Sequence, residues 1–315
     1  MNRYLGIDIG GTTIKYGLYD EDGNSIKNIE NKIKTPKYSL SKFLDTLMNI
    51  INEFEELDGI GMSIPGCINP DNGYIQNGGS IRCLDNVNII NEMSRLTDIK
   101  VEIENDANCA LLAEKWIGNA IDSSNFICMT VGTGIGGAIY INNQLIRGHN
   151  FFSGEFGYMI IEDIYEKFKI HTLNKDSATV PFTKNIAREK GLDIKNISGN
   201  EIFELIEAGD LYVIEYYKRW IRRLAICIYN LGFILDPQKI LIGGGVSSES
   251  RFISDLKWEI ESISIELIPE LGKLESLHSR WEICACKHYN DSGKIGAVYN
   301  FISRNRENKL AENKI

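Results

Sequence analysis

The chain has 315 residues, a length that corresponds to about two domains of usual size. With 43% hydrophobic and 24% charged residues, the composition is that of a globular protein with a sizeable core. The net charge of -9 disfavours general nucleic-acid binding, because an acidic surface repels phosphate backbones, although a nucleotide needs only a local positive site.

The N-terminus and the cysteines indicate where the protein works. Met1–Tyr4 leads directly into Leu5–Ile9, a run too short for the apolar part of a signal peptide, and no apolar run is long enough to span a bilayer. We therefore expect a soluble, cytoplasmic protein with no membrane partner. The seven cysteines are expected to be free thiols, and the Cys284, Cys286 pair has no second pair nearby to complete a zinc site.

The first half of the chain is predicted to contain mostly strands, with two helices. Apolar residues recur at helical spacing between residues 39 and 55, which indicates an amphipathic helix. Residues 66–86 are expected to be rich in loops. The predicted strands are Tyr4–Ile9, Ile14–Tyr19, Ser25–Ile33, Ile60–Ile64 and Val101–Glu104, and the second helix covers Ala107–Ile117.

The second half repeats the opening pattern of the first. Its predicted strands are Phe126–Val131, Ala138–Ile141, Gln144–Ile146, Lys239–Ile242 and Trp281–Cys286, and its predicted helices cover residues 175–190, 199–207, 210–235, about 249–266, and Ser292–Ile302. Each half begins with a strand, a glycine turn and another strand. This repetition predicts a duplicated α/β domain with a cleft between the two halves.

The segment Asp8–Thr13 ends the first strand in a glycine turn, with Lys15 beyond it. Its two glycines have no side chain, so backbone N–H groups can approach a phosphate closely, and its two threonines add hydroxyl donors. The aspartate could hold Mg²⁺, directly or through water. A tight hairpin with an incidental aspartate is the alternative.

Two further glycine turns follow, at Gly132–Gly137 and Gly243–Gly245. Such glycine-rich turns are costly in chain entropy unless a close backbone approach is needed. The first of them, paired with the turn near the N-terminus, could hold one polyphosphate from both sides, and Gly243–Gly245 could receive a purine and a ribose. Gly132–Gly137 is neither a Rossmann motif, since a strand follows it, nor a Walker A motif, and a plain strand–helix turn is the alternative for Gly243–Gly245.

Two segments carry acids that suit a sugar hydroxyl. In Glu104–Asn108, Asp106 could accept a hydroxyl proton while Asn105 fixes another hydroxyl, although Asn and Asp are also favoured helix caps. In Ser153–Tyr158, Glu155 could bind two vicinal hydroxyls, or it could be a solvated loop acid. The four histidines show no ligand spacing and receive no role.

In this order, these five segments resemble the ROK family of bacterial sugar kinases and repressors, within the actin/hexokinase/Hsp70 superfamily. The resemblance extends from Tyr4 to about Phe301. It implies a two-lobed, actin-like ATPase (ribonuclease-H-like) α/β fold with a central cleft. The expected N-terminal lobe is residues 1–117 with a closing helix at about 290–303, and the expected C-terminal lobe is residues 118–289.

The resemblance also implies roles for individual residues. ATP is expected at the three glycine turns, on Asp8, Gly10, Gly11, Thr12, Thr13, Lys15, Gly132, Thr133, Gly134, Gly136, Gly137, Gly244 and Gly245. Asp106 matches the catalytic base, Asp8 would hold Mg²⁺, and the sugar is expected at Gly79, Asn105, Asp106 and Glu155. A homodimer is also expected.

One departure from the family pattern narrows the expected substrate. The family usually has histidine at Tyr158 and a cysteine-rich zinc loop after it, but no cysteine lies between Cys128 and Cys227, so no structural zinc is expected. Gly78–Arg82 and Asp85-Asn86 resemble the zinc-less β-glucoside kinase branch, which phosphorylates the 6-hydroxyl of the non-reducing glucose in cellobiose-like disaccharides. The alternative is an Arg82–Asp85 loop salt bridge with Tyr158 in the core.

Three other functions stay open. Another ROK kinase would act on glucose, N-acetylmannosamine or fructose. A ROK-type repressor is disfavoured, because the first phosphate motif begins within ten residues of Met1 and no helix-turn-helix precedes it. A sugar-responsive protein without catalysis is disfavoured by Asp106 and the two phosphate turns.

Overall fold

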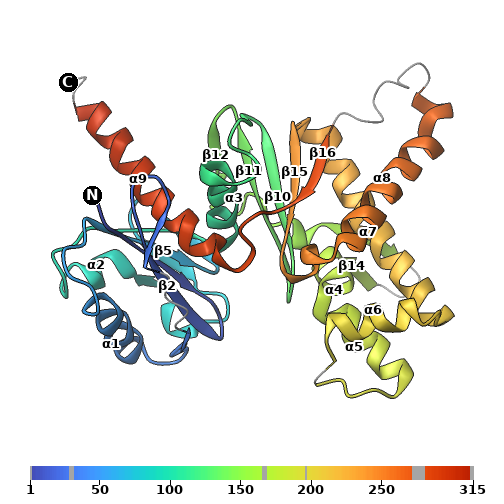
Figure 1. The fold of residues 1–315 in the computed structure, drawn as a ribbon, viewed down its shortest axis with the longest axis horizontal. Helices are drawn as coiled ribbons and strands as arrows, with labels where there is room; N and C mark the ends of the chain where they lie inside the picture. Colours follow the sequence, from blue (N-terminus) through green and yellow to red (C-terminus); the bar gives the residue numbers. More distant parts are fainter. Residues whose placement is uncertain (1, 28–31, 165–168, 196, 272–280, 313–315) are drawn as a thin grey trace. The chain divides into compact units, whose positions relative to one another are not determined.

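The computed structural model describes residues 2–27, 32–164, 169–195, 197–271 and 281–312 (Figure 1). Contacts divide the chain into two compact units. Unit 1 comprises Met1–Asp122, Arg147–Ser153 and Asn290–Ile315, and unit 2 comprises Ser123–Ile146 and Gly154–Tyr289. The sequence analysis placed the first limit at residue 117 and did not separate Arg147–Ser153 from its flanks.

Unit 1 is built on a mixed sheet in the order β3-β2-β1-β5-β9, with β4 also pairing with β2. Strand β1 is antiparallel to β2 and parallel to β5, which is parallel to β9. All six residues of β5 are buried, as expected for an interior parallel strand. The strands are β1 (Tyr4–Ile9), β2 (Thr13–Tyr19), β3 (Ser25–Lys27), β4 (Lys32–Lys34), β5 (Gly59–Ile64) and β9 (Val101–Asn105).

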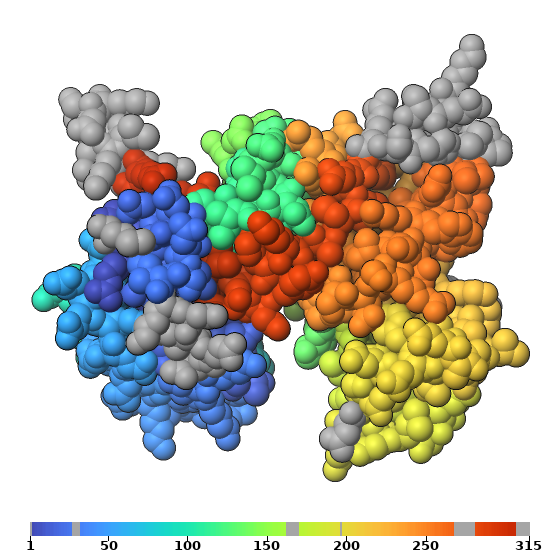
Figure 2. Space-filling model, viewed as in Figure 1, coloured from blue at the N-terminus to red at the C-terminus, as the bar shows by residue number. Residues whose placement is uncertain are grey.

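The C-terminal helix α9 (Ser292–Glu312) packs on this sheet and on α3 (Asp106–Ile117). Figure 2 shows the surface of α3, in green, beside that of α9, in orange-red. A Cβ on Gly6 would lie 2.5 Å from the Lys294 carbonyl oxygen, so this glycine allows the helix to approach the strand closely. The other helices of this unit are α1 (Leu40–Ile51) and α2 (Ile89–Met93).

The segment expected to be loop-rich contains regular structure instead. Strands β6 (Cys67–Asn69), β7 (Tyr74–Asn77) and β8 (Val87–Asn88) form a small antiparallel sheet, and Arg82–Leu84 forms a 3₁₀ turn. Ile68, Ile75 and Leu84 are buried, so these short elements hold an apolar side against the unit 1 core.

Unit 2 repeats the strand pairing of unit 1 in the order β12-β11-β10-β15-β16. Strand β10 is antiparallel to β11 and parallel to β15, which is parallel to β16. The predicted duplication is therefore confirmed. The strands are β10 (Phe126–Val131), β11 (Ile135–Ile141), β12 (Gln144–Ile146), β15 (Lys239–Gly243) and β16 (Glu282–Ala285).

The helices of unit 2 surround a core that contains Trp220. They are α4 (Leu173–Ser177), α5 (Thr179–Lys190), α6 (Gly199–Glu207), α7 (Leu211–Leu235) and α8 (Ser250–Leu271). Asp210 caps α7, and the helix ends just before Pro237 as predicted. In the described part of the chain, no helix has the length and apolar character needed to cross a membrane.

Two expectations for unit 2 were wrong, and one pair of strands was not predicted. The helix expected over residues 175–190 breaks at Ala178, which has an extended backbone. The antiparallel pair of β13 (Ile160–Ile164) and β14 (Lys169–Thr172) was not predicted, and β11 begins at Ile135 rather than Ala138. Gly136 and Gly137, which were expected to form part of the turn, therefore lie in β11. The glycine pattern alone does not show whether a neighbouring strand pairs with these residues.

Candidate active site

The first glycine turn, Gly10–Thr13, is a short loop between β1 and β2 with two available N–H groups. Gly10 N donates to Thr13 O (3.0 Å), and Thr35 donates to Thr12 O from its backbone (3.0 Å) and to Gly10 O from its hydroxyl (2.7 Å). The N–H groups of Gly11 and Thr12 have no partner among the described residues. The turn is thus fixed in a shape that offers donors to an anion.

Asp8 lies at the end of β1, beside this turn, and it is largely buried. Its Oδ1 accepts a hydrogen bond from Ser63 Oγ (3.0 Å), and its Oδ2 lies 3.8 Å from Lys15 Nζ. Burial raises the pKa of Asp8, while Lys15 and Ser63 act to lower it. Lys15 also donates to the backbone oxygen of Asn290 (3.4 Å), so its ammonium is held next to Asp8.

The single carboxylate of Asp8 suits Mg²⁺ better than it suits a metal ion whose ligands all come from protein side chains. Among the described residues, no group of three His, Cys, Asp or Glu side chains could hold a metal ion. Mg²⁺ usually takes one or two carboxylates and completes its shell with water and substrate phosphates. Asp8 fits that role beside a turn with two available N–H groups, and the absence of structural zinc stays a prediction.

Asn105, not Asp106, caps the N-terminus of α3. The Asn105 Oδ1 accepts from the backbone N–H groups of Ala107 (2.9 Å) and Asn108 (3.2 Å), and its Nδ2 donates to Gly66 O (3.0 Å). Asp106 is the first residue of the helix and is exposed, and its Oδ1 accepts from Ala107 N (3.0 Å). The carboxylate of Asp106 is therefore accessible to a substrate while the cap is provided by its neighbour.

An ion pair between Glu104 and Arg147 supports the Asn105–Asp106 segment. The sequence analysis missed the arginine. Glu104 is 1% exposed, and Arg147 Nε and Nη2 each lie 2.7 Å from its Oε2. Its Oε1 accepts from Asn105 N (2.9 Å) and Asn108 Nδ2 (2.9 Å). Paired on both oxygens, the buried carboxylate fixes the backbone directly before Asp106. No local motif signals an arginine 43 positions away.

The loop around Gly79 lies next to Asn105 in unit 1. Gly79 has a φ of 61° and donates to Asn77 Oδ1 (2.7 Å). A Cβ on Gly66 would lie 2.9 Å from Gly79 N, and Gly66 O accepts from Asn105. The structure thus brings together Gly79 and Asn105, while Arg82 and Asp85 form the loop ion pair (3.4 Å) that was the alternative explanation for them.

The second glycine turn, Gly132–Gly134, offers the same arrangement in unit 2. Gly132 N donates to Gly134 O (2.9 Å), and Gly132 O accepts from Thr179 N (2.8 Å). The N–H groups of Thr133 and Gly134 have no partner in the described part of the chain. As in the first turn, two backbone donors at the tip are free to bind an anion.

Gly136 and Gly137 lie in β11, and the structure gives Gly137 a packing role. A Cβ on Gly137 would lie 2.2 Å from the Phe156 ring, and one on Gly154 would lie 2.4 Å from Gly137 O. These glycines let the loop Gly154–Gly157 pack directly on the strand. Glycine content alone does not separate such a packing contact from a phosphate contact.

The third turn, Gly243–Gly245, leads from β15 into a 3₁₀ helix and borders a cavity. Gly244 has a φ of 90°, and a Cβ there would lie 2.2 Å from Val131 O, so its glycine is required by the backbone. A Cβ on Gly245 would meet no atom within 4 Å, and this residue lines the cavity.

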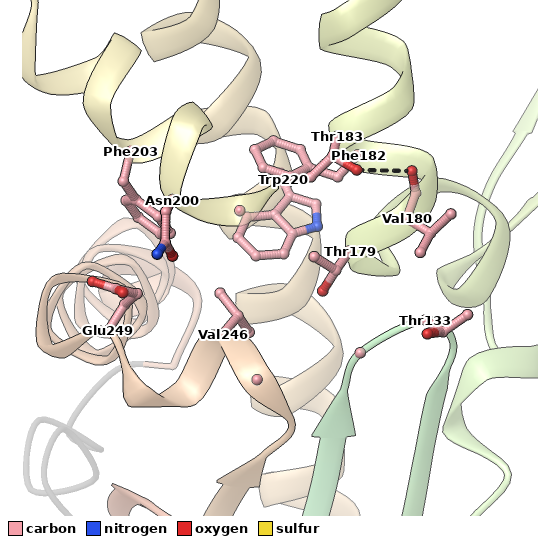
Figure 3. A pocket seen from close by; sticks show the side chains of 13 residues that line it. Thr133, Thr179, Val180, Phe182, Thr183, Asn200, Phe203, Trp220, Val246 and Glu249 are labelled. Atoms are coloured by element: carbon pink, nitrogen blue, oxygen red, sulfur yellow. Dashed lines mark hydrogen bonds between the residues drawn. The ribbon is translucent and has the colours of Figure 1, made fainter. Parts of the chain in front are cut away.

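This cavity has a volume of about 420 Å³ and lies wholly within unit 2 (Figure 3). On its apolar side, the rings of Phe182 and Trp220 stack with centroids 4.3 Å apart. Figure 3 shows Asn200 and Glu249 toward one end and Thr133 toward the other. An apolar wall with a few polar groups at its ends is typical of small-molecule sites of about 300–1,000 Å³. Sequence reasoning missed Phe182, Trp220 and Asn200, which lie in three separate helices, and Glu249, which directly precedes α8.

Glu155 stands at the start of the 3₁₀ turn Phe156–Tyr158, in unit 2. Burial raises the pKa of Glu155, and its carboxylate has no hydrogen-bond partner among the described residues. Tyr158 is 72% exposed, so the expectation that it could lie in the core is wrong. An acid without a partner and an exposed aromatic ring, three residues apart, suit a polar ring-shaped ligand.

The sequence model of the ROK family matches residues 4–303. This chain belongs to the ROK family. A beta-glucoside kinase of Listeria monocytogenes is 36% identical over 302 residues, which covers 95% of this chain and 97% of the relative. A beta-glucoside kinase of Klebsiella pneumoniae is 34% identical and covers 95% of this chain and 96% of the relative.

A solved ROK structure shares the fold. The ROK family protein from Streptococcus pneumoniae, determined in complex with sucrose, superposes with a TM-score of 0.85 at 29% identity. The superposition covers 97% of this chain and 99% of that one. Together with the two mixed sheets, this likeness confirms the expected two-lobed, actin-like α/β fold.

Proposed function

We propose that this ROK sugar kinase phosphorylates the 6-hydroxyl of the non-reducing glucose of a β-glucoside such as cellobiose, with ATP as the donor. The observation that carries the proposal is the 36% identity to a beta-glucoside kinase over nearly the whole chain. The related ROK structure with bound sucrose supports an acceptor with two rings. Glucose and N-acetylmannosamine are the alternative acceptors.

The proposed roles are assigned within each unit by itself. The free N–H groups of Gly11, Thr12, Thr133 and Gly134 bind phosphate oxygens, and the cavity lined by Trp220 takes the adenosine. Mg²⁺, when bound through Asp8, would neutralise charge on the phosphates. Asn105 offers the sugar only the second hydrogen of its Nδ2, because its oxygen caps α3.

Asp106 is proposed as the general base. Its carboxylate accepts the proton of the sugar hydroxyl as that oxygen bonds to the γ-phosphorus and the bond to the β–γ bridging oxygen breaks, releasing ADP. The Glu104–Arg147 pair keeps the residue before it in place. Phosphoryl transfer relies mainly on positioning and charge stabilisation, which fits a site with few chemical groups.

The acceptor is tested by measuring ADP release with glucose, cellobiose, gentiobiose and N-acetylmannosamine. We expect kcat/KM to be about fivefold higher for cellobiose than for glucose, since stacking on an aromatic ring contributes about 1 kcal/mol. Tyr158→Ala should remove most of that preference, whereas Tyr38→Ala, at another exposed tyrosine in unit 1, should keep it. A ratio that favours glucose contradicts the β-glucoside assignment, and no ADP release above background with any sugar contradicts the kinase assignment.

Sugar binding should weaken as the pH falls through the pKa of Glu155. Burial raises that pKa, so the carboxylate is protonated at a higher pH than an ordinary glutamate and then no longer accepts two hydroxyls. Affinity is therefore fully present above the raised pKa and lost below it. The measurement is sugar affinity against pH without nucleotide, in which Glu155→Gln should flatten the profile and exposed Glu189→Gln should leave it unchanged. A wild-type profile identical to that of Glu155→Gln would refute the assignment.

A further inference from the structure

We propose that Asn174 is a positioning residue that couples nucleotide binding to sugar binding within unit 2. It would do so by holding the second glycine turn, Gly132–Gly134, and the Glu155 loop, Gly154–Gly157, in one fixed arrangement. The inference rests on the proposed kinase function, which assigns phosphate to the turn and sugar to the loop.

Asn174 holds the turn through its amide oxygen. It lies in α4, and its Oδ1 accepts a hydrogen bond from the N–H of Ile135, the residue that follows the turn (2.8 Å). A Cβ on Gly134 would lie 3.0 Å from the same oxygen. Because Gly132 O is held by Thr179 N, the turn is fixed at both ends by the segment that contains α4 and the start of α5.

The same asparagine contacts the Glu155 loop. A Cβ on Gly157 would lie 3.1 Å from Asn174 Cβ and 2.4 Å from Ile135 O. Ile135 is thus contacted by Asn174 at its N–H and by Gly157 near its carbonyl oxygen. Leu173 N also donates to Met159 O (2.9 Å), which joins the start of α4 to the segment that directly follows that loop.

This packing gives a route for coupling between two ligands. A nucleotide that orders the turn would order Ile135, and through it the loop that carries Glu155, so a sugar arriving second would lose less conformational entropy. Thermodynamic linkage requires the sugar to strengthen nucleotide binding by the same factor. The coupling depends on the acceptor at position 174, because the Asn174 side chain accepts the hydrogen bond of the Ile135 N–H.

The experiment measures the coupling factor by calorimetry. Cellobiose is titrated into the full chain without nucleotide and then with a saturating non-hydrolysable ATP analogue, and the ratio of the two dissociation constants is the coupling factor. Coupling of this kind commonly amounts to about fivefold or more. We expect such a factor for the wild type and a factor near 1 for Asn174→Ala.

Two further variants separate coupling from a general loss of structure. Asn174→Asp keeps an oxygen that can accept from Ile135 N, so it should restore the coupling factor even if its charge weakens the nucleotide. Lys175→Ala, at the next and exposed residue of α4, should match the wild type. All four proteins are compared by thermal melting, so a loss of coupling in a folded Asn174→Ala protein supports the proposal.

The proposal is overturned if Asn174→Ala keeps the wild-type factor, or if it weakens both ligands while the factor stays the same. It is also overturned if the wild type binds both ligands without coupling. Failure of the kinase proposal has a different signature, because then no sugar yields ADP whatever the coupling factor is.

Discussion

Replacement of Asp106 by Asn is expected to lower kcat by about 10²–10⁴-fold, the usual effect of losing a general base. An asparagine of the same size cannot accept the hydroxyl proton. The α3 cap should survive, because the side chain of Asn105 provides it. The loss of a negative charge at the first helical position should cost only about 0.3–1 kcal/mol of stability.

The measurement is single-turnover phosphorylation at saturating ATP and sugar, with both dissociation constants determined separately. Asp45→Asn, at an exposed residue of α1 in the same unit, is the matched control and should behave as the wild type. If Asp106→Asn turned over within a few-fold of the wild type, Asp106 would not be the base, and its role would be limited to the helix terminus.

The change Gly134→Val should weaken ATP binding about 10–100-fold and affect sugar binding much less. A valine would cover the free N–H groups of Thr133 and Gly134, and hydrogen bonds to a charged partner contribute about 1.5–3 kcal/mol. Gly134 does not have a positive φ, so the backbone itself accepts a side chain. The loss would therefore not report on backbone strain.

Gly134→Ala provides the graded comparison for this prediction. Its Cβ would lie 3.0 Å from Asn174 Oδ1, so only a small shift of that side chain is needed and the effect on ATP should be weaker than for valine. Calorimetry with ATP and with the sugar gives both affinities for each variant. Unchanged ATP affinity together with a loss of sugar affinity would mean that this turn does not bind phosphate.

The glycine turns show how far the sequence predicts a site. The order strand, glycines, strand predicted both hairpins, and the tips at Gly11 and Gly134 carry free N–H groups as that pattern requires. The same reasoning treated Gly137 as a phosphate residue, whereas the structure packs Phe156 against it. A missing Cβ leaves room for a ligand or for another side chain, and only the tertiary contacts distinguish the two.

The catalytic segment shows a second limit. Sequence reasoning found Asp106 at a helix start, because strand and cap signals are local, but it did not separate the capping role of Asn105 from a sugar-binding role. The choice depended on where the backbone N–H groups of the first helical turn point, which the residue types alone do not specify.

The sequence by itself determined the duplicated α/β pattern, the positions of the three glycine turns and the candidate base, because each of these depends on residues within about a dozen positions of one another. Only the tertiary structure decided that Arg147 supports Glu104, that Trp220 forms a wall of a cavity, and that Tyr158 is exposed. These features arise from packing between elements that are far apart in the chain. Such contacts produce no periodic pattern in the local sequence, so the sequence alone does not predict them.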